Sequence, residues 1–153
     1  MIDQPDVNLL CRVGTRYCAL PLACVLEMMR PLPVEPLAGM PSFVRGVSVI
    51  RGALVPVVDA SALLGSADGA LRGRFVTIRS GARRVALAVD EVLGVHEFPR
   101  AALQELPPLV REASAEVVSA LGTLDRELLL VLHAAHLVPE DVWQVLNGGK
   151  STP

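Results

Sequence analysis

The chain has 153 residues, 52% of them hydrophobic and only 3% aromatic, and its formal net charge is −2 at pH 7. This length suits one domain that buries a core of aliphatic side chains without needing disulfides or metal ions. The acidic balance and the scarcity of aromatic rings exclude nucleic acid as a partner, because its binding requires basic surfaces and stacking platforms.

The N-terminal fifth of the chain is predicted to form two strands and a short helix. Apolar alternation over 7–13 and 16–20, separated by Gly14-Thr15, is typical of a hairpin. Pro21 can then open a helix that runs through Val25 to Met28. An ordered connector of short extended pieces follows, because each proline removes a donor and restricts its neighbour; these prolines are Pro31, Pro33, Pro36 and Pro41.

A central hairpin is predicted between Val44 and Asp59. Two apolar, β-branched runs flank Arg51-Gly52, and a glycine can supply the positive φ that a tight reversal requires. A charged tip on an apolar ribbon suggests a contact surface. One helical turn is expected at 61–65, ahead of a Gly/Ala-rich loop at 66–73.

The second half of the chain is predicted to be mostly strands. A hairpin over 75–78 and 83–89 turns at Ser80-Gly81-Ala82, and 92–95 extends it into a further strand. After a second connector marked by Pro99, Pro107 and Pro108, two more strands fit 117–121 and 127–132.

A terminal helix is predicted from Pro139 to Leu146, with Glu140 and Asp141 in its first turn and Gly148-Gly149 after its end. Many short strands at close spacing, with no exact internal repeat, indicate small barrels or a sandwich. We expect one domain over 7–146, with flexible termini at 1–6 and 147–153.

The sequence predicts a cytoplasmic protein with no direct membrane insertion. The N-terminus lacks the basic and apolar regions of a secretion signal, and no apolar run reaches about 18 residues. Cys11, Cys18 and Cys24 form an odd set without C-x-x-C spacing, which favours reduced, buried thiols over disulfides.

Candidate catalytic groups are weak, and we expect no enzyme, no metal and no cofactor. His133 and His136 could share one face of a helical turn, but no complementary metal ligands lie nearby. Asp90-Glu91 suits a solvated strand end better than an acid/base dyad. A small enzyme with Cys24 as its nucleophile is the alternative from another class, although apolar neighbours favour an inert thiol.

Glu27 and Arg51 are charged residues beside apolar runs that are expected to be buried. Each side chain can simply be solvated. Alternatively, the two pair across an interface between lobes, where removing one partner of a desolvated pair costs about 3–5 kcal/mol.

From Leu9 to Leu146 the chain resembles the CheW family of chemotaxis coupling proteins. The resemblance depends on the order and spacing of short motifs: Val13–Tyr17, Val25–Glu27, Pro41–Val47, Ile50–Gly52, Val55–Asp59, Val85–Val92, Leu121-Gly122 and Leu128–Leu132. It implies a mainly β fold of two small five-stranded SH3-like barrels that pack together, with short helices and a C-terminal helix.

The resemblance also implies a noncatalytic adaptor. Family members bind the cytoplasmic hairpin of chemoreceptors, which lies in the groove between the barrels, and the regulatory domain of a CheA-type histidine kinase. Other CheW-like proteins are further expected partners, and the adaptor is expected at receptor arrays. By analogy, Glu27 and Arg51 form the acid and arginine pair near the receptor groove, and the remaining partner-binding residues are Val25, Gly46, Val47, Gly52 and Val55.

Two departures from the family pattern affect the predicted partners. Val49 stands where a polar Asn commonly precedes the hairpin turn, and Ala60-Ser61 replaces the Leu-Arg that follows the Asp. Losing a polar group and a positive charge could alter one partner surface while preserving the fold. The alternative is therefore a divergent paralogue that binds receptors without the kinase.

Overall fold

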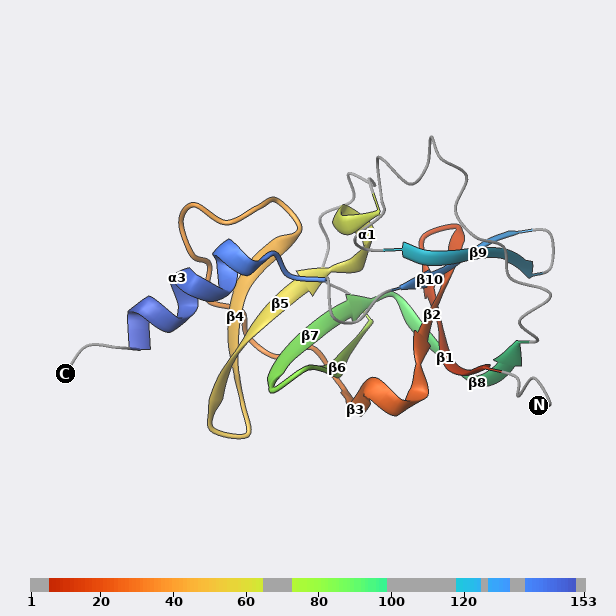
Figure 1. The fold of residues 1–153 in the computed structure, drawn as a ribbon, viewed down its shortest axis with the longest axis horizontal. Helices are drawn as coiled ribbons and strands as arrows, with labels where there is room; N and C mark the ends of the chain where they lie inside the picture. The colour runs from red at the N-terminus through yellow and green to blue at the C-terminus, as the bar shows by residue number, and fades with distance from the viewer. Residues whose placement is uncertain (1–5, 65–72, 99–117, 125–126, 133–136, 151–153) are drawn as a thin grey trace.

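The computed structural model describes residues 6–64, 73–98, 118–124, 127–132 and 137–150. Strands dominate this part of the chain, and short helices follow three of them (Figure 1). In chain order the elements are β1 (Asp6–Val13), β2 (Arg16–Pro21), the 3-10 helix η1 (Leu22–Cys24), β3 (Val25–Met29), β4 (Val44–Ile50), β5 (Ala53–Asp59), α1 (Ala60–Leu63), β6 (Arg74–Ser80), β7 (Arg83–Val89), β8 (Glu91–Phe98), β9 (Val118–Leu124), β10 (Glu127–Leu132) and α3 (Glu140–Lys150).

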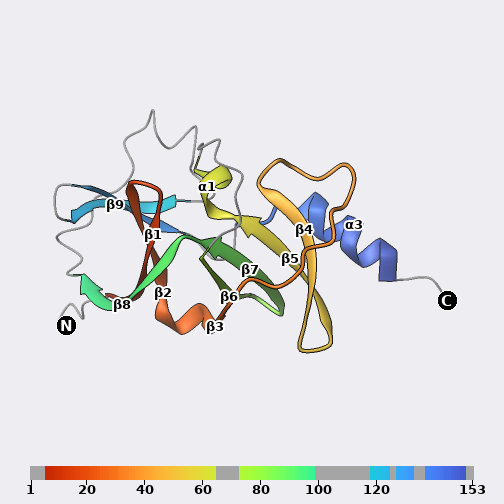
Figure 2. The same cartoon turned by 180° about the vertical axis from the view of Figure 1, so that it is seen from behind.

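The strands form two five-stranded sheets, which confirms the expected mainly β architecture. Sheet A has the order β8-β1-β2-β10-β9, and sheet B has the order β3-β6-β7-β5-β4. Neighbouring strands are antiparallel, except that β10 runs parallel to β2 and β5 runs parallel to β7. The two sheets lie side by side along the long axis of the molecule (Figures 1 and 2).

The two halves of the chain repeat one arrangement with exchanged strands. If five is added to each strand number of sheet B, with β11 read as β1 and β12 read as β2, its strand order becomes that of sheet A. The third strand of each half crosses over, so β3 pairs with β6 and β8 pairs with β1. Even the bulges correspond, since both crossover pairings shift register. Each sheet therefore needs strands from both halves of the chain.

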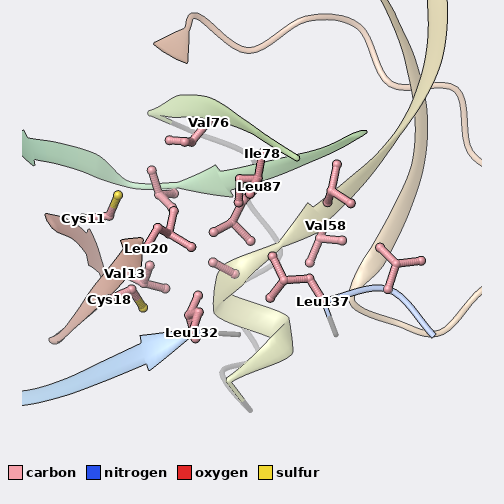
Figure 3. Packing of buried hydrophobic residues seen from close by; sticks show 14 of the residues in the cluster. Cys11, Val13, Cys18, Leu20, Val58, Val76, Ile78, Leu87, Leu132 and Leu137 are labelled. Atoms are coloured by element: carbon pink, nitrogen blue, oxygen red, sulfur yellow. The ribbon is translucent and has the colours of Figure 1, made fainter. Parts of the chain in front are cut away.

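The main hydrophobic core lies between the two sheets. Cys18 and Leu20 from sheet A pack with Ile78 and Leu87 from sheet B and with Leu137 ahead of the terminal helix (Figure 3). The opposite face of each sheet buries a smaller cluster of its own. Because strand side chains alternate between faces, strands buried on both sides contain continuous apolar runs, as at Leu129–Leu132.

The prediction of a helix through Val25 to Met28 is wrong. Helical geometry is limited to η1, and β3 follows at once as an edge strand with alternating exposure. The cause is tertiary: β6 has an unpaired edge, and β3 supplies its partner from Val25 opposite Ile78 to Met29 opposite Phe75. Local sequence does not contain this pairing, so propensity alone could not reveal it.

The other elements agree with the sequence predictions apart from their ends. Helix α1 starts at Ala60, and α3 continues through Gly148-Gly149 to Lys150, since glycine disfavours a helix by only about 1 kcal/mol. Strand β8 also extends beyond both ends of the predicted 92–95. The second connector and the pair His133 and His136 lie outside the described residues. None of the described helices is long and apolar enough to cross a membrane.

Candidate partner-binding surface

The β4–β5 hairpin projects from sheet B and ends in a two-residue turn (Figure 1). Ile50 lies opposite Ala53, and the two residues between them have positive φ, 52° at Arg51 and 78° at Gly52. Positive φ at both central positions defines a type I′ turn, whose twist matches the flanking strands. Arg51 is the only non-glycine with positive φ among the described residues, so the tip holds an arginine in an unfavoured backbone region.

The Arg51 side chain forms a two-point ion pair with Glu27. Its Nε donates to Glu27 Oε2 at 2.7 Å and its Nη2 donates to Oε1 at 3.0 Å. The Arg51 side chain is 68% exposed and that of Glu27 is 32% exposed. The hydrogen bond from Arg51 lowers the pKa of Glu27, and the same bond raises the pKa of Arg51.

The predicted pairing of Glu27 with Arg51 is confirmed, but the pair does not bridge two lobes. Both residues belong to sheet B, where β3 and β4 are the two edge strands. The ion pair therefore joins the tip of one edge strand's hairpin to the opposite edge. The location differs from the prediction because β3 crosses over to pair with β6.

Thr77 on β6 holds the backbone of Glu27 in place. The Glu27 amide donates to Thr77 Oγ1 at 3.1 Å, and this hydroxyl lies 3.2 Å from the Glu27 carbonyl oxygen, to which it donates. Thr77 is buried, so its hydroxyl has few other partners. The register shift between Val25 and Glu27 lies directly before this contact and sets the direction of the carboxylate.

Gly46 allows the connector after β3 to approach β4 closely. Glu35 and Val47 exchange two backbone hydrogen bonds, of 2.8 and 2.9 Å. Gly46 has φ 140°, and a Cβ at this position would lie 2.0 Å from the Glu35 carbonyl oxygen. The glycine is therefore required by both its conformation and the lack of space.

An apolar groove of about 590 Å³ opens between this connector and the hairpin. Val49 and Leu54 lie opposite each other on the ribbon and are 66% and 47% exposed. Val47 is buried at the groove floor. The groove is lined by Leu32, Pro33, Val34, Glu35, Val47, Val49 and Leu54.

The structure gathers only some of the predicted partner-binding residues at the groove. Val47 lines it, Gly46 shapes its connector wall, and Gly52 completes the turn. Val25 is half-buried against the core between the sheets. Val55 is 1% exposed and packs inside sheet B, so it supports the hairpin and adds no exposed apolar surface.

Three apolar residues that line the groove were not predicted from the sequence. Leu32 and Val34 lie in the proline-rich connector, and Leu54 follows the turn. A signal existed for Leu54, because residues equally distant from a two-residue turn are cross-strand neighbours and Val49 is its apolar partner. The connector walls had no such signal.

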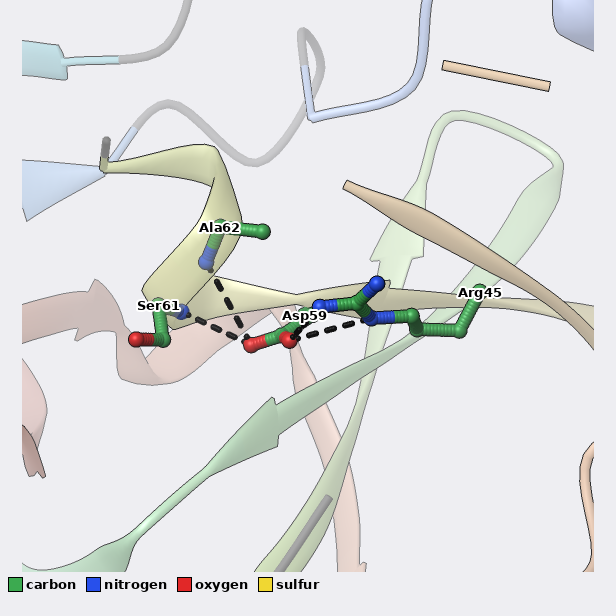
Figure 4. A network of polar contacts seen from close by, with 4 residues as sticks. All are labelled: Arg45, Asp59, Ser61 and Ala62. Carbon is green, nitrogen blue, oxygen red and sulfur yellow. Dashed lines mark hydrogen bonds and ion pairs between the residues drawn. The ribbon is translucent and has the colours of Figure 1, made fainter. Parts of the chain in front are cut away.

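Asp59 has a structural role at the end of β5 (Figure 4). Its Oδ2 accepts from Arg45 Nε at 3.1 Å and from Nη2 at 2.6 Å, and its Oδ1 accepts from the amides of Ser61 and Ala62. The carboxylate thus caps helix α1, and Arg45 neutralises its buried negative charge. Ala60 and Ser61 belong to this cap, with Ala60 fully buried.

The acidic residue at the β7–β8 junction is also structural. Asp90 Oδ2 accepts from the Gly14 amide at 2.6 Å, and the Asp90 amide donates to the Arg12 carbonyl. The side chain therefore fixes the β1–β2 turn where the chain crosses from sheet B to sheet A. This contact gives Asp90 a structural role at the strand end.

The thiols lie in an apolar environment. Cys11 and Cys18 are cross-strand partners in the core, and burial raises the pKa of each to about 12. Cys24 is half-buried against the same core, and all three cysteines are free. Within the described ranges no three His, Cys, Asp or Glu residues gather as metal ligands would.

Comparison with known proteins identifies similarity over most of the chain. Residues 8–142 match the model of the CheW-like domain. The chain is 33% identical over 134 residues to Protein FrzA of Myxococcus xanthus, with 83% of each chain covered. It is 30% identical over 141 residues to the Chemotaxis protein CheA of Klebsiella aerogenes, covering 81% of this chain and 21% of CheA. The crystal structure of the scaffolding protein TtCheW from Thermoanaerobacter tengcongensis superposes with a TM-score of 0.72 at 17% identity, covering 84% of this chain and 89% of that one.

Proposed function

The chain belongs to the family of CheW-like domains, whose members are noncatalytic adaptors in chemotaxis signalling, and on that premise we propose that it couples chemoreceptors to a CheA-type histidine kinase. Its place would be in the cytoplasm at receptor arrays. The observation that carries the proposal is the apolar groove on sheet B, bordered by the exposed pair Val49 and Leu54 and by the projecting hairpin whose tip forms the Arg51–Glu27 ion pair.

A receptor helix would bind with its apolar side in this groove. Burying a large aliphatic side chain contributes about 1.5–3 kcal/mol, so Val49 and Leu54 supply most of the affinity. The Arg51–Glu27 pair holds the hairpin over the sheet and keeps the groove in shape. All lining residues belong to β4, β5 and the connector, so we place the receptor site on sheet B and not between the two sheets.

Receptor co-sedimentation tests this assignment. Val49→Asp and Leu54→Asp are expected to weaken binding at least about tenfold, because each places a charge on the buried part of the contact. Arg51→Glu is expected to abolish binding while leaving the circular-dichroism spectrum unchanged. Val95→Asp is the matched control, since Val95 is a valine on sheet A whose exposure, 55%, lies between those of Leu54 and Val49. If Val95→Asp lost receptor binding while Val49→Asp and Leu54→Asp kept it, the groove on sheet B would be refuted as the receptor site.

The divergent paralogue that binds receptors but not the kinase remains a second candidate. Val49 favours it, because a 66% exposed valine stands where the family commonly has a polar residue. Calorimetric titration with the CheA regulatory domain separates the two functions. Heat and co-elution support the coupling adaptor, whereas their absence with intact receptor binding supports the paralogue.

A further inference from the structure

The β6–β7 end of sheet B carries two arginines directly opposite each other. Arg79 and Arg84 are cross-strand partners in the register, and both are exposed. Opposite residues of this kind have Cβ atoms about 5 Å apart, and like charges there destabilise the pair. Neither side chain forms a hydrogen bond or an ion pair among the described residues.

Sheet A offers an internal comparison for this pair. Strands β1 and β2 correspond to β6 and β7, and Arg12 opposite Tyr17 occupies the equivalent place one pair away from the turn. There the guanidinium lies 4.5 Å from the ring centre and donates to the phenol oxygen at 2.7 Å. The fold therefore accommodates an arginine paired with a neighbouring side chain at this position, whereas sheet B presents two exposed arginines without a hydrogen-bonded partner among the described residues.

The surroundings of Arg84 add a pocket of about 310 Å³ with both polar and apolar walls. Its walls come from the start of β5, the β6–β7 turn and helix α3, which lies beside β4 and β5 in both views (Figures 1 and 2). Leu54, Ala82, Trp143 and Leu146 supply apolar atoms, and the polar part of the lining comes from Arg84 and from Arg83, whose guanidinium lies 4.9 Å from the centre of the Trp143 ring. Arg84 also contributes, after Arg51, to the lowered pKa of Glu27.

We propose that this end of sheet B, formed by Arg79, Arg84 and the pocket beside Trp143, binds an acidic segment of a partner protein that places one apolar side chain in the pocket. Spaced carboxylates can pair with both guanidiniums and remove their mutual repulsion. A continuous polyanion fits less well, because Glu27 and Glu140 flank the arginines and the chain is acidic overall. Apart from Leu54, these residues take no part in the receptor groove, so the two proposals fail independently.

Fluorescence anisotropy with synthetic peptides tests the proposal. Three fluorescein-labelled helical peptides of about 15 residues share a leucine face and carry Glu, Gln or Lys at all other positions. The Glu peptide is expected to bind at least about tenfold more tightly than the Gln peptide, and the difference should shrink at about 0.5 M salt. Equal binding of all three peptides, or no binding, would overturn the proposal.

Variants of the full chain locate the contact. Arg79→Glu and Arg84→Glu should each weaken binding of the Glu peptide, whereas Arg74→Glu, at the other end of β6 and equally exposed, should not. Arg79→Glu should also raise the melting temperature, since it replaces a repulsive cross-strand pair with an attractive one. A gain in stability with a loss of binding cannot result from misfolding.

Vesicles of phosphatidylcholine with about 30% phosphatidylserine provide the competing occupant. We expect them to bind more weakly than the Glu peptide and without sensitivity to Arg79→Glu. Tighter binding to the vesicles that is lost in Arg79→Glu would assign the arginines to a membrane surface and overturn the peptide proposal.

Discussion

Gly46 shows how one missing side chain positions the groove. The glycine permits the Glu35–Val47 backbone contact that forms one groove wall. Its role was predicted as part of a partner-binding motif, but its physical basis required the structure, because local sequence does not show that the preceding connector folds back against β4. The same holds for Asp59, whose place in the motif reflects a helix cap and an ion pair with Arg45.

Gly46→Ala should destabilise the protein much more than Gly81→Ala. Both glycines have positive φ, which costs an L-residue about 1–2 kcal/mol, but a Cβ at Gly81 meets no atom within 4 Å. The clash with Glu35 should raise the loss at Gly46 to about 3 kcal/mol or more. Urea unfolding of both variants measures the difference, and equal losses would show that the connector moves without cost.

At the scale of elements, hairpins were predictable and crossovers were not. The central and second hairpins follow from alternation around Gly-containing turns, which is local information. The crossover of β3 depends on the free edge of β6, and the groove depends on where the connector returns to β4. The hydrophobic alternation of the sequence also predicted that Arg51 lies at the tip of the central hairpin. Its contact with Glu27 could be located only from the structure, because β3 lies at the opposite edge of the same sheet.

The stability that the Arg51–Glu27 ion pair gives to the contact between the β4–β5 tip and β3 should depend on pH. Since Arg51 holds the pKa of Glu27 below its ordinary value of 4.5, the folded state favours the ionised carboxylate. The resulting stability is fully present above pH 4.5 and is lost as the pH falls through the lowered pKa. Stability measured from pH 7 to pH 3 should therefore fall less in Glu27→Gln than in the natural chain. Glu97→Gln, an exposed glutamate on sheet A, serves as the control.

At the scale of the whole molecule, the exchanged strands make the two halves dependent on each other. Sheet A lacks β8, β9 and β10 without the second half, and sheet B lacks β3, β4 and β5 without the first. The core between the sheets also combines residues of both halves. No repeat is visible in the sequence, because equivalent positions share strand register but not residue type or burial, as Arg12–Tyr17 and Arg79–Arg84 show.

Separate expression of residues 1–64 and 73–153 tests this dependence. Neither fragment should show cooperative thermal unfolding alone, and an equimolar mixture should recover the strand signal and a single transition. Circular dichroism is the measurement. A cooperative transition in either fragment by itself would show that one sheet forms from a single half.

The matching strand orders of the two sheets bear on how this two-sheet chain could have arisen from a shorter one. Two identical five-strand chains that exchanged their last three strands would make an intertwined homodimer with the same two sheets. Joining them end to end gives the present chain, and it releases the two halves from having to stay identical. One half keeps the contact of Arg12 with the Tyr17 ring, while the other half has two exposed arginines, Arg79 and Arg84, at the equivalent positions. Sheet B can therefore carry surface features that sheet A lacks, an asymmetry that a homodimer of identical chains cannot encode.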